Sequence, residues 1–342
     1  MKLLIVKRDK IGDMLLTTPL LAHLRAHMPQ AQIHVLANDY NAWVLSGNPD
    51  VDKVWTYRRT KHGNSLRWTA PLHEAWLVLQ HRLLGFDAVL VGNGTESQRA
   101  IKRGIRAGAR RVVAYCEDAS RYPGLTDPLP QQASRHEAIN LAALAEPLGI
   151  PLPASLPFPR YLLPEDAEDF ATHWLRERGL ERGKYVVLGL GARRAKKQPA
   201  TEQIVRWATA FKREMGLDTV FMWTPGRSDN PLYPGDDEVA QPVLDTGLPH
   251  LHPFRGALQP ALGLIWGART SLFPDSGLMH FAAASPGGVL GFFAETDVSP
   301  SPVQWAPLGR NVDWLEAERA ISGLPDDLVL SRVERLVAGS GR

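Results

Sequence analysis

The sequence predicts an α/β protein with two Rossmann-like domains, each built on a doubly wound parallel sheet. Three observations lead to this prediction. In both halves of the chain, short apolar strand-like runs alternate with helical segments, as in parallel sheets covered by helices on both faces. The chain has 342 residues, enough for two domains with separate cores. Between the halves, residues 150–165 contain five prolines, which indicates a linker.

The first half begins with an apolar run, Leu3–Val6, followed by a loop and a helical pattern. Similar apolar runs and helical periodicities continue to Gly149, which can cap the last helix at its C-terminus. Residues 117–135 are rich in Pro, Ser, Asp and Gln and are expected to form a surface loop. We expect strands at 3–6, 32–37, 51–57, 87–91 and 111–114, and helices at 14–27, 73–84, 97–106 and 136–148.

The second half repeats this alternation, with a polar turn at 225–235. We expect helices at 165–179, 200–215, 258–267, 277–284 and 326–337, and strands at 185–190, 219–223, 270–273 and 289–293, the last completing the sheet. The predicted domains are therefore residues 1–160 and 161–325. Residues 326–342 form a C-terminal helix that we expect to pack back on the first domain.

The composition is that of an ordinary soluble protein, with 44% hydrophobic and 22% charged residues. A net charge of +3 is too small for a dedicated nucleic-acid binder. Cys116 is the only cysteine, which excludes an internal disulfide and a cysteine-rich zinc site and fits the reducing cytoplasm. No apolar run reaches the roughly 18 residues of a spanning helix. The opening MKLLIV is cut too short by Lys7 and Arg8 to be a signal sequence.

Basic residues gather in two short stretches of the chain. Both stretches can meet anionic groups on substrates or on a membrane surface, and the alternative is two solvated faces. They comprise Arg99, Lys102, Arg103, Arg106, Arg110 and Arg111 in the first, and Arg193, Arg194, Lys196 and Lys197 in the second.

The segment from Phe273 to Ala284, FPDSGLMHFAAA, is the strongest functional signal. A strand runs into Asp275, Ser276 and Gly277, and a helix carrying His280 then begins. The free amides of a first helical turn and the helix dipole attract anions. This turn therefore suits a ligand with a phosphate and hydroxyls, such as a nucleotide sugar; an ordinary capped helix with a core histidine is the alternative.

Two further loops follow predicted strands, where ligands of open parallel sheets bind. In the first, Gly12 permits a tight turn and Asp13 follows it, placed to act as a general base on a sugar hydroxyl or merely to cap the next helix. The second contains Gly191, and after it Lys196 and Lys197, either of which can neutralise a diphosphate. Neither loop has a dinucleotide G-x-G-x-x-G or a Walker motif, and no metal-ligand spacing or G-x-S-x-G occurs.

Taken together, these segments resemble glycosyltransferase family 9, the ADP-heptose:lipopolysaccharide heptosyltransferases and their relatives. The resemblance spans nearly the whole chain. It rests on KRDKIGDMLLTTPLLAHLRAHMPQAQIHVLA from Lys7 with the GNPDVDKVW stretch after it, on RHEAINLAALAEPLGI, on the basic loop ending in KKQP, and on DSGLMHFAA from Asp275. The first and last are specific when found together.

The resemblance implies a GT-B architecture, in which two Rossmann-like domains face a central cleft. It implies inverting sugar transfer without a cofactor or essential metal, from a nucleotide-sugar donor, favoured to be ADP-linked, to a lipid-linked or oligosaccharide acceptor. It also implies a cytoplasmic protein that can contact the inner membrane peripherally.

By the same resemblance, Asp13 is the base and Lys196 contacts donor phosphate. Asp275 binds donor hydroxyls, the amides of Ser276 and Gly277 hold the diphosphate, and His280 orients that turn. Gly191 belongs to the donor loop. Candidate acceptor contacts are Lys7, Arg8, Lys10, Arg99 and Arg103.

The chain departs from the family pattern at Gln198, where tryptophan is usual, and at Pro274. These departures leave the donor sugar open. Two other functions compete with an inverting transferase: a catalytically silent nucleotide-sugar-binding or scaffold protein on the same fold, and an NAD-dependent oxidoreductase, which the missing glycine fingerprint disfavours.

Overall fold

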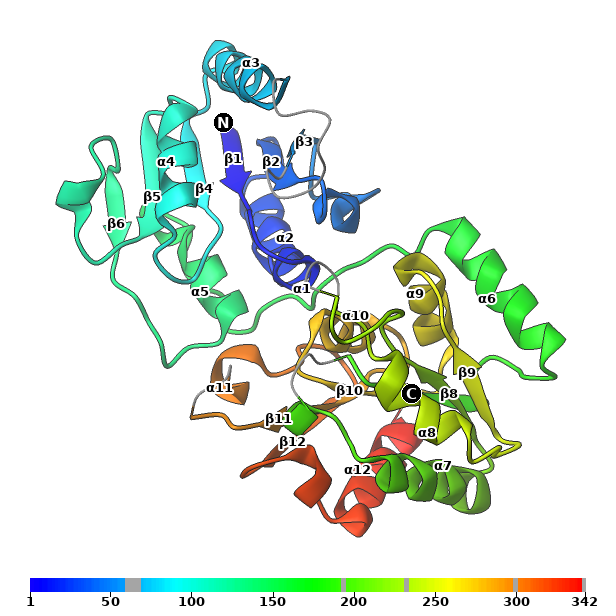
Figure 1. The fold of residues 1–342 in the computed structure, drawn as a ribbon. Coiled ribbons are helices and arrows are strands. Elements are labelled where there is room, and N and C mark those ends of the chain that lie inside the picture. Colours follow the sequence, from blue (N-terminus) through cyan, green and yellow to red (C-terminus); the bar gives the residue numbers. More distant parts are fainter. Residues whose placement is uncertain (59–68, 192–194, 231–233, 298–300, 340–342) are drawn as a thin grey trace. The chain divides into compact units, whose positions relative to one another are not determined.

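The computed structural model describes residues 1–58, 69–191, 195–230, 234–297 and 301–339 (Figure 1). The chain forms two compact units, Met1–Leu162 and Leu163–Arg342. Each unit contains a six-stranded sheet in which neighbouring strands are parallel. The predicted α/β class with two doubly wound sheets is confirmed. The central cleft implied by the resemblance stays a prediction.

In the first unit the strand order is β3-β2-β1-β4-β5-β6, the order of dinucleotide-binding folds. All four residues Leu3 to Val6 of β1 are buried, because helices cover both faces of the sheet. The strands are β1 (Lys2–Val6), β2 (Gln32–Asn38), β3 (Lys53–Tyr57), β4 (Ala88–Val91), β5 (Arg111–Tyr115) and β6 (Asp127–Leu129). The helices are α1 (Ile11–Leu15), α2 (Thr18–His27), α3 (Thr69–Leu84), α4 (Gln98–Arg106) and α5 (Glu137–Ala143), with the 3₁₀ turns η1 (Ala42–Leu45), η2 (Ala119–Arg121) and η3 (Glu146–Leu148).

The single helix predicted over 14–27 is wrong: the chain forms α1 and α2 with a break at Thr17. Pro19 has no amide hydrogen, so it cannot donate to the carbonyl of Leu15 as a helix interior requires. The hydroxyl of Thr18 donates to that carbonyl instead, at 2.7 Å. The Thr17 hydroxyl donates to the carbonyl of Asp13 at 2.8 Å. The break separates the short helix α1, which carries Asp13, from the longer helix α2, which follows it in the chain.

Two other predictions for the first unit need correction. The expected loop over 117–135 contains the edge strand β6, which pairs with β5 despite Pro128 because an edge strand can leave one donor unused. The expected helix over 136–148 stops at Ala143 and continues as the turn η3, which contains Pro147. Gly149 ends this turn in the left-handed region, with φ of 82°.

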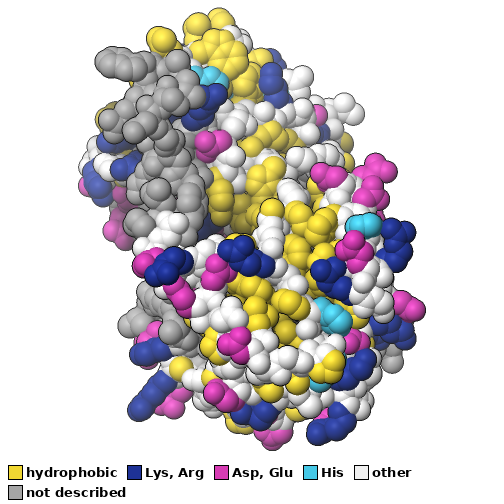
Figure 2. All heavy atoms as spheres, turned by 45° about the vertical axis from the view of Figure 1, so that its right-hand side comes forward, with side chains coloured by type: hydrophobic (Ala, Val, Ile, Leu, Met, Phe, Trp, Pro, Cys, Tyr) yellow, Lys and Arg dark blue, Asp and Glu magenta, His cyan; other side chains and the backbone are white. Residues whose placement is uncertain are grey.

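Helix α3 packs on the first unit through Leu77 but leaves large apolar side chains in solvent. Figure 2 shows hydrophobic side chains gathered over α3, at the top of the view. Among the described residues, none of the helices combines the length and apolar character that crossing a membrane requires.

The second unit repeats the topology of the first, with the order β12-β11-β10-β7-β8-β9. Counted from β7, this is again the dinucleotide-fold order, although the sequence shows no internal repeat. Its strands are β7 (Tyr185–Gly189), β8 (Asp218–Met222), β9 (Leu251–Phe254), β10 (Thr270–Pro274), β11 (Val289–Ala294) and β12 (Val312–Ala317). Its helices are α6 (Glu165–Glu177), α7 (Thr201–Met215), α8 (Asp237–Leu244), α9 (Leu258–Gly267), α10 (Gly277–Ala284), α11 (Pro302–Trp305) and α12 (Asp326–Gly339), with the 3₁₀ turns η4 (Ala195–Lys197) and η5 (Ile321–Gly323).

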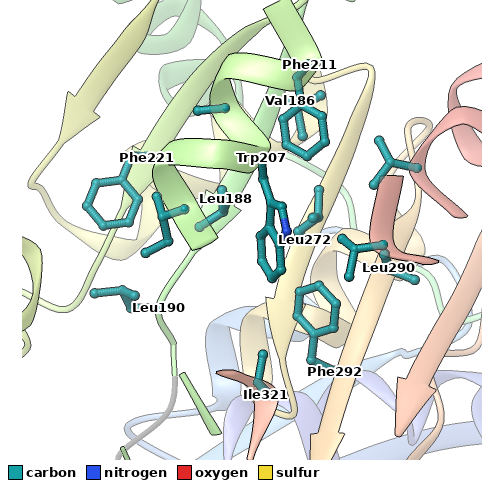
Figure 3. Packing of buried hydrophobic residues seen from close by; sticks show 14 of the residues in the cluster. Val186, Leu188, Leu190, Trp207, Phe211, Phe221, Leu272, Leu290, Phe292 and Ile321 are labelled. Carbon is teal, nitrogen blue, oxygen red and sulfur yellow. The ribbon is translucent and has the colours of Figure 1, made fainter. Parts of the chain in front are cut away.

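The core of this unit is built around Trp207 of α7. Its ring stacks on Phe292 of β11 with the ring centroids 5.6 Å apart, and Figure 3 shows Leu188, Leu272 and Leu290 around them. The indole nitrogen donates to Oδ1 of Asp326 at 2.7 Å, which ties α7 to the start of α12.

The C-terminal helix α12 is part of the second unit, where Val329, Val333 and Leu336 are buried in the core. The expectation that it packs back on the first domain stays a prediction. Its amphipathic stripe is thereby covered within its own unit. The prediction that the strand at 289–293 completes the sheet is wrong, because β12 pairs with β11 beyond it.

Gly189, at the end of β7, is required by the packing of Phe273. A methyl group there would lie 2.0 Å from Cε1 of Phe273, whose side chain is fully buried in β10. We expect Gly189→Ala to lower the free energy of unfolding by about 1–3 kcal/mol. Gly323→Ala, where nothing lies within 4 Å, should leave it unchanged. Urea unfolding of both variants checks this, and equal midpoints would refute the packing argument.

Candidate active site

The charged loops predicted from the sequence lie at the same topological position in each unit. In the first sheet the strand order reverses between β1 and β4, and in the second between β7 and β10. Such switch points are where ligands of doubly wound sheets bind, because the loops from the two strands diverge there. The Lys7–Asp13 loop follows β1, and the Asp275 turn follows β10.

Lys7 is the centre of the first switch point. Its side chain is fully buried, and its Nζ lies 3.2 Å from Oδ2 of Asp9. That carboxylate also accepts a hydrogen bond at 2.6 Å from Nδ2 of Asn93, two residues after β4. A buried ammonium needs such compensation, since burial penalises charge. Lys7 therefore acts on the carboxylates of this loop from a buried position. Its side chain does not reach the surface, where the acceptor contact expected from the sequence would lie.

Two asparagines, one at the end of β2 and one just after it, hold the backbone of the same loop. Nδ2 of Asn38 donates to the carbonyl of Arg8 at 2.6 Å, and Nδ2 of Asn41 donates to the carbonyl of Asp9 at 3.0 Å. Both asparagines are buried. The loop is thus fixed from the strands on either side of β1, as a preorganised site requires.

Asp13 lies in the first turns of α1 and is half-buried. Its Oδ2 accepts a hydrogen bond from the amide of Lys10 at 3.2 Å, so it does cap the helix, as the alternative interpretation held. Burial raises its pKa above the ordinary value of an aspartate, and the negative charge of Asp9 adds to the effect. The charge of Lys7 acts in the opposite direction. A carboxylate with a raised pKa is a stronger proton acceptor than an exposed one.

Glu137 completes this cluster and was not predicted from the sequence. It begins α5, is 4% exposed, and its Oε1 accepts a hydrogen bond from the amide of Gly94 at 3.0 Å. Burial raises its pKa, while the charge of Lys7 lowers it. Burial alone would lower the pKa of Lys7, but Asp9, Asp13 and Glu137 hold it above the ordinary lysine value. The buried ammonium of Lys7 thus interacts electrostatically with three carboxylates, those of Asp9, Asp13 and Glu137.

In the second unit, Asp275 forms a buried ion pair with Lys197. Oδ2 of Asp275 lies 2.7 Å from Nζ of Lys197, and the side chains are 13% and 8% exposed. Lys197 belongs to η4, after β7, and Asp275 follows β10, so the pair joins the two loops of the switch point. The sequence offered either lysine for a diphosphate, and the family resemblance assigned that role to Lys196. Its Nζ lies 2.7 Å from Oε1 of Glu295, and its side chain is 62% exposed.

The turn after Asp275 forms the N-terminus of α10. Ser276 is the N-cap residue, and its side chain makes no capping hydrogen bond. The amides of the first turn, starting at Gly277, therefore have no side-chain cap within this turn. Gly191 lies opposite with φ of 42°, and a methyl group there would lie 3.1 Å from Oγ of Ser276. The two loops approach closely at this point, as glycine permits.

His280 belongs to the helix that this turn begins, and Gln198 lies between η4 and α7. His280 is buried in α10, with its ring centroid 6.4 Å from that of Trp305. Gln198, at the position where the family resemblance predicts tryptophan, donates from Nε2 to Oδ1 of Asp236 at 2.8 Å. Arg193 and Arg194 lie outside the described residues.

An apolar cavity of about 210 Å³ opens at the same end of the second sheet. Gly191 forms part of its wall, next to the Asp275 turn, and Leu278 of α10 contributes another part. Small-molecule pockets are mostly apolar with a few polar groups at one end. The remaining wall comes from the ends of β8, β9 and β10, from the loops after β8 and β9, and from α9, namely Met222, Trp223, Thr224, Pro225, Phe254, Gly256, Leu258, Ala261 and Phe273.

A polar pocket of about 290 Å³ in the first unit brings together three of the predicted acceptor contacts, Arg8, Arg99 and Arg103. Lys102, Arg106 and Glu74 complete its wall. Lys10 is exposed, and Lys7 is part of the buried cluster described above. Among the described residues, no group of three or more His, Cys, Asp or Glu side chains is arranged to hold a metal ion.

No family model and no curated protein matches the sequence. The structure, in contrast, is similar to solved structures over nearly the whole chain. A glycosyl transferase family 9 protein from Veillonella parvula has a TM-score of 0.82 at 19% identity, covering 98% of this chain and 97% of that one. E. coli ADP-heptose lps heptosyltransferase II has a TM-score of 0.75 at 20% identity, covering all of both chains. E. coli heptosyltransferase WaaC with ADP has a TM-score of 0.74 at 18% identity, covering 98% and 100%. The predicted fold of two Rossmann-like domains is therefore shared with these structures.

Proposed function

Starting from the fold shared with these transferases, we propose that the chain is an inverting glycosyltransferase. It moves a heptose or related sugar from a nucleotide-diphosphate donor to a lipopolysaccharide or other surface-glycan acceptor. The observation that carries the proposal is the placement of reactive groups: the Asp13 cluster lies at the switch point of one sheet and the Asp275–Lys197 pair at that of the other. Each unit thus has the groups to hold one substrate.

The chemical groups of a nucleotide-sugar donor match those of the second unit. The apolar cavity beside Gly191 suits a nucleobase, and the neighbouring amides of α10 suit a diphosphate. Lys196 can exchange Glu295 for phosphate because it is exposed, whereas Lys197 fixes the carboxylate of Asp275 for sugar hydroxyls. E. coli heptosyltransferase WaaC was determined with ADP, which supports an ADP-linked donor here.

In the proposed reaction, Asp13 takes the proton of an acceptor hydroxyl as that oxygen bonds to the anomeric carbon. The bond from that carbon to the diphosphate oxygen breaks, and the nucleoside diphosphate leaves with the electron pair. Attack from the face opposite the leaving group inverts the anomeric configuration. Lys196 and the α10 amides stabilise the charge that develops on the diphosphate, so the proposal needs no cofactor.

The rate should rise with pH as Asp13 loses its proton, with the acid limb of kcat/KM above the ordinary aspartate pKa of about 3.9. Lys7 lowers the pKa of Asp13, so Lys7→Gln should move this limb upward by roughly one pH unit or more. Lys10→Gln, which removes the weakest of these charge effects, should shift it less. pH–rate profiles of the three proteins test this, and coincident acid limbs would contradict the role of Lys7.

The competing function is a catalytically silent nucleotide-sugar-binding protein. Such a protein needs the Asp275 site but not the buried Asp13 cluster. A thermal-shift screen against ADP-, GDP-, UDP- and dTDP-sugars should give one selective stabilisation. Assay of that sugar nucleotide with acceptor then separates the two functions: release of nucleoside diphosphate supports transfer, and binding without release supports the silent protein. A selective response to NAD(H) instead would favour an oxidoreductase.

A further inference from the structure

A single carboxylate joins two of the loops that form the wall of the apolar cavity. Asp237 is the first residue of α8 and does not line the cavity itself. Its Oδ1 accepts hydrogen bonds from Nε1 of Trp223 at 2.8 Å and from Nε of Arg255 at 2.9 Å. Its Oδ2 accepts them from the amide of Gly226 at 3.0 Å and from Nη2 of Arg255 at 2.8 Å. Asp237 thus ties the loop after β8 to the loop after β9.

The loop after β8 is anchored on both sides of the residues that it gives to the cavity. Trp223, Thr224 and Pro225 line the cavity, and Gly226 follows them. Besides the contacts of its carboxylate, Asp237 donates from its own amide to the carbonyl of Gly226 at 3.1 Å. The indole of Trp223 and both polar groups of the Gly226 backbone are therefore bound to Asp237. Thr224 and Pro225, between these two anchors, are held in place by the same residue.

The loop after β9 is held by Arg255, which lies between two cavity residues, Phe254 and Gly256. Its contact with Asp237 is bidentate, the most specific geometry that an arginine and a carboxylate can form. The ring of Phe254 also packs 6.0 Å from that of Trp174 in α6, so this wall has support of its own. Loss of the Asp237 contact should therefore loosen the wall without unfolding the unit.

The hydrogen-bonding capacity of Asp237 is already filled. A carboxylate has about four lone-pair positions, and the four contacts of Asp237 use them all. Arg255, followed by Trp223, holds the pKa of Asp237 far below the ordinary value of an aspartate, so the group is ionised at neutral pH. Asp237 therefore has no position left for a substrate hydroxyl. It is suited to hold the cavity wall and not to bind a substrate directly.

We propose that Asp237 and Arg255 are positioning residues that hold the apolar cavity at the width of a planar nucleobase. This inference rests on the proposed function, because it takes the base of the nucleotide-sugar donor as the occupant. Walls that are fixed before the ligand arrives lose less conformational entropy on binding. The two residues should accordingly determine the affinity for the nucleotide and have no part in the chemical step.

Calorimetric titration with ADP, GDP, UDP and dTDP measures this affinity. Asp237→Asn should raise the Kd of the nucleotide that the wild type binds by roughly tenfold, since the amide nitrogen accepts no hydrogen bond and two of the four contacts are lost. Arg255→Gln, which removes only the link to the loop after β9, should raise it less. In transfer assays both variants should raise the donor KM and leave kcat within about twofold of the wild type.

Amide hydrogen exchange reports on the two walls without any nucleotide. Asp237→Asn should accelerate exchange in residues 223–226 and 254–256, and Arg255→Gln in 254–256 only. Asp229→Asn is the matched control, because Asp229 lies in the loop after β8 and also forms a bidentate pair, with Arg227 at 3.1 Å. These two side chains are 67% and 73% exposed, so the control should change neither the exchange of the walls nor the affinity for the nucleotide.

The inference is overturned if Asp237→Asn binds the nucleotide as tightly as the wild type, or if its walls exchange like those of the control. A lower kcat with an unchanged donor KM would also overturn it, because Asp237 would then act in the chemical step. Failure of the proposed function has a different signature. The wild type would then bind none of the four nucleotides, although Asp237→Asn still accelerated exchange in both walls, and the nucleobase would be excluded as the occupant.

Discussion

Asp13→Asn should lower kcat for sugar transfer by about 10²–10⁴-fold, the usual contribution of a general base. The amide has nearly the same shape but cannot accept a proton from the acceptor hydroxyl. The affinity for the nucleotide sugar should stay close to that of the wild type, because the proposed donor site lies in the second unit. Steady-state kinetics combined with calorimetric titration of the donor measure both quantities.

Glu146→Gln provides a matched control for this variant. It makes the same acid-to-amide change at an exposed position of the first unit, and it should leave transfer and donor binding unaltered. If Asp13→Asn retained substantial turnover, Asp13 would not be the base, and Glu137 would become the next carboxylate of the same cluster to test.

The adjacent lysines Lys196 and Lys197 should respond differently to the same substitution. Lys197→Met leaves the carboxylate of Asp275 without its buried partner, which should cost about 3 kcal/mol of unfolding free energy. Lys196→Met removes only a surface pair with Glu295, so stability should hardly change. Its effect should instead be a donor KM raised by roughly tenfold, the loss of one charge-assisted contact to phosphate.

Urea unfolding and donor kinetics of the two variants separate these roles. Combining Lys197→Met with Asp275→Asn should restore much of the stability, since no unpaired charge remains, but not the activity. If Lys197→Met were stable and raised only the donor KM, while Lys196→Met had no effect, the two assignments would have to be exchanged.

The sequence predicted the positions of Asp13 and Asp275 because the signal for each is local: a strand, a turn with glycine, and a helix start. It missed Glu137 and the ion pair of Lys197 with Asp275, because these contacts depend on distant partners. Lys197 pairs with a residue 78 positions away, and Glu137 binds an amide 43 positions away. The topological switch points bring these segments together, and no local pattern encodes which of two adjacent lysines faces inward.

The central strands were predicted well, since their buried apolar runs are unambiguous. The missed elements are edge strands or contain proline. β6 has only three residues and includes Pro128, β9 includes Pro253, and α8 contains Pro242. Proline argues against regular structure in a single sequence, but an edge strand tolerates it because one side of the strand needs no partner.

The most direct test of the proposed transferase is an assay of the chain with the nucleotide sugar selected by the thermal-shift screen and heptose-deficient lipopolysaccharide as acceptor. Nucleoside diphosphate release and sugar incorporation are followed together. Our account predicts equal amounts of both in the wild type, dependence on the acceptor, and loss of both in Asp13→Asn. Tight donor binding by the wild type without release or incorporation would contradict it and support a silent binding protein.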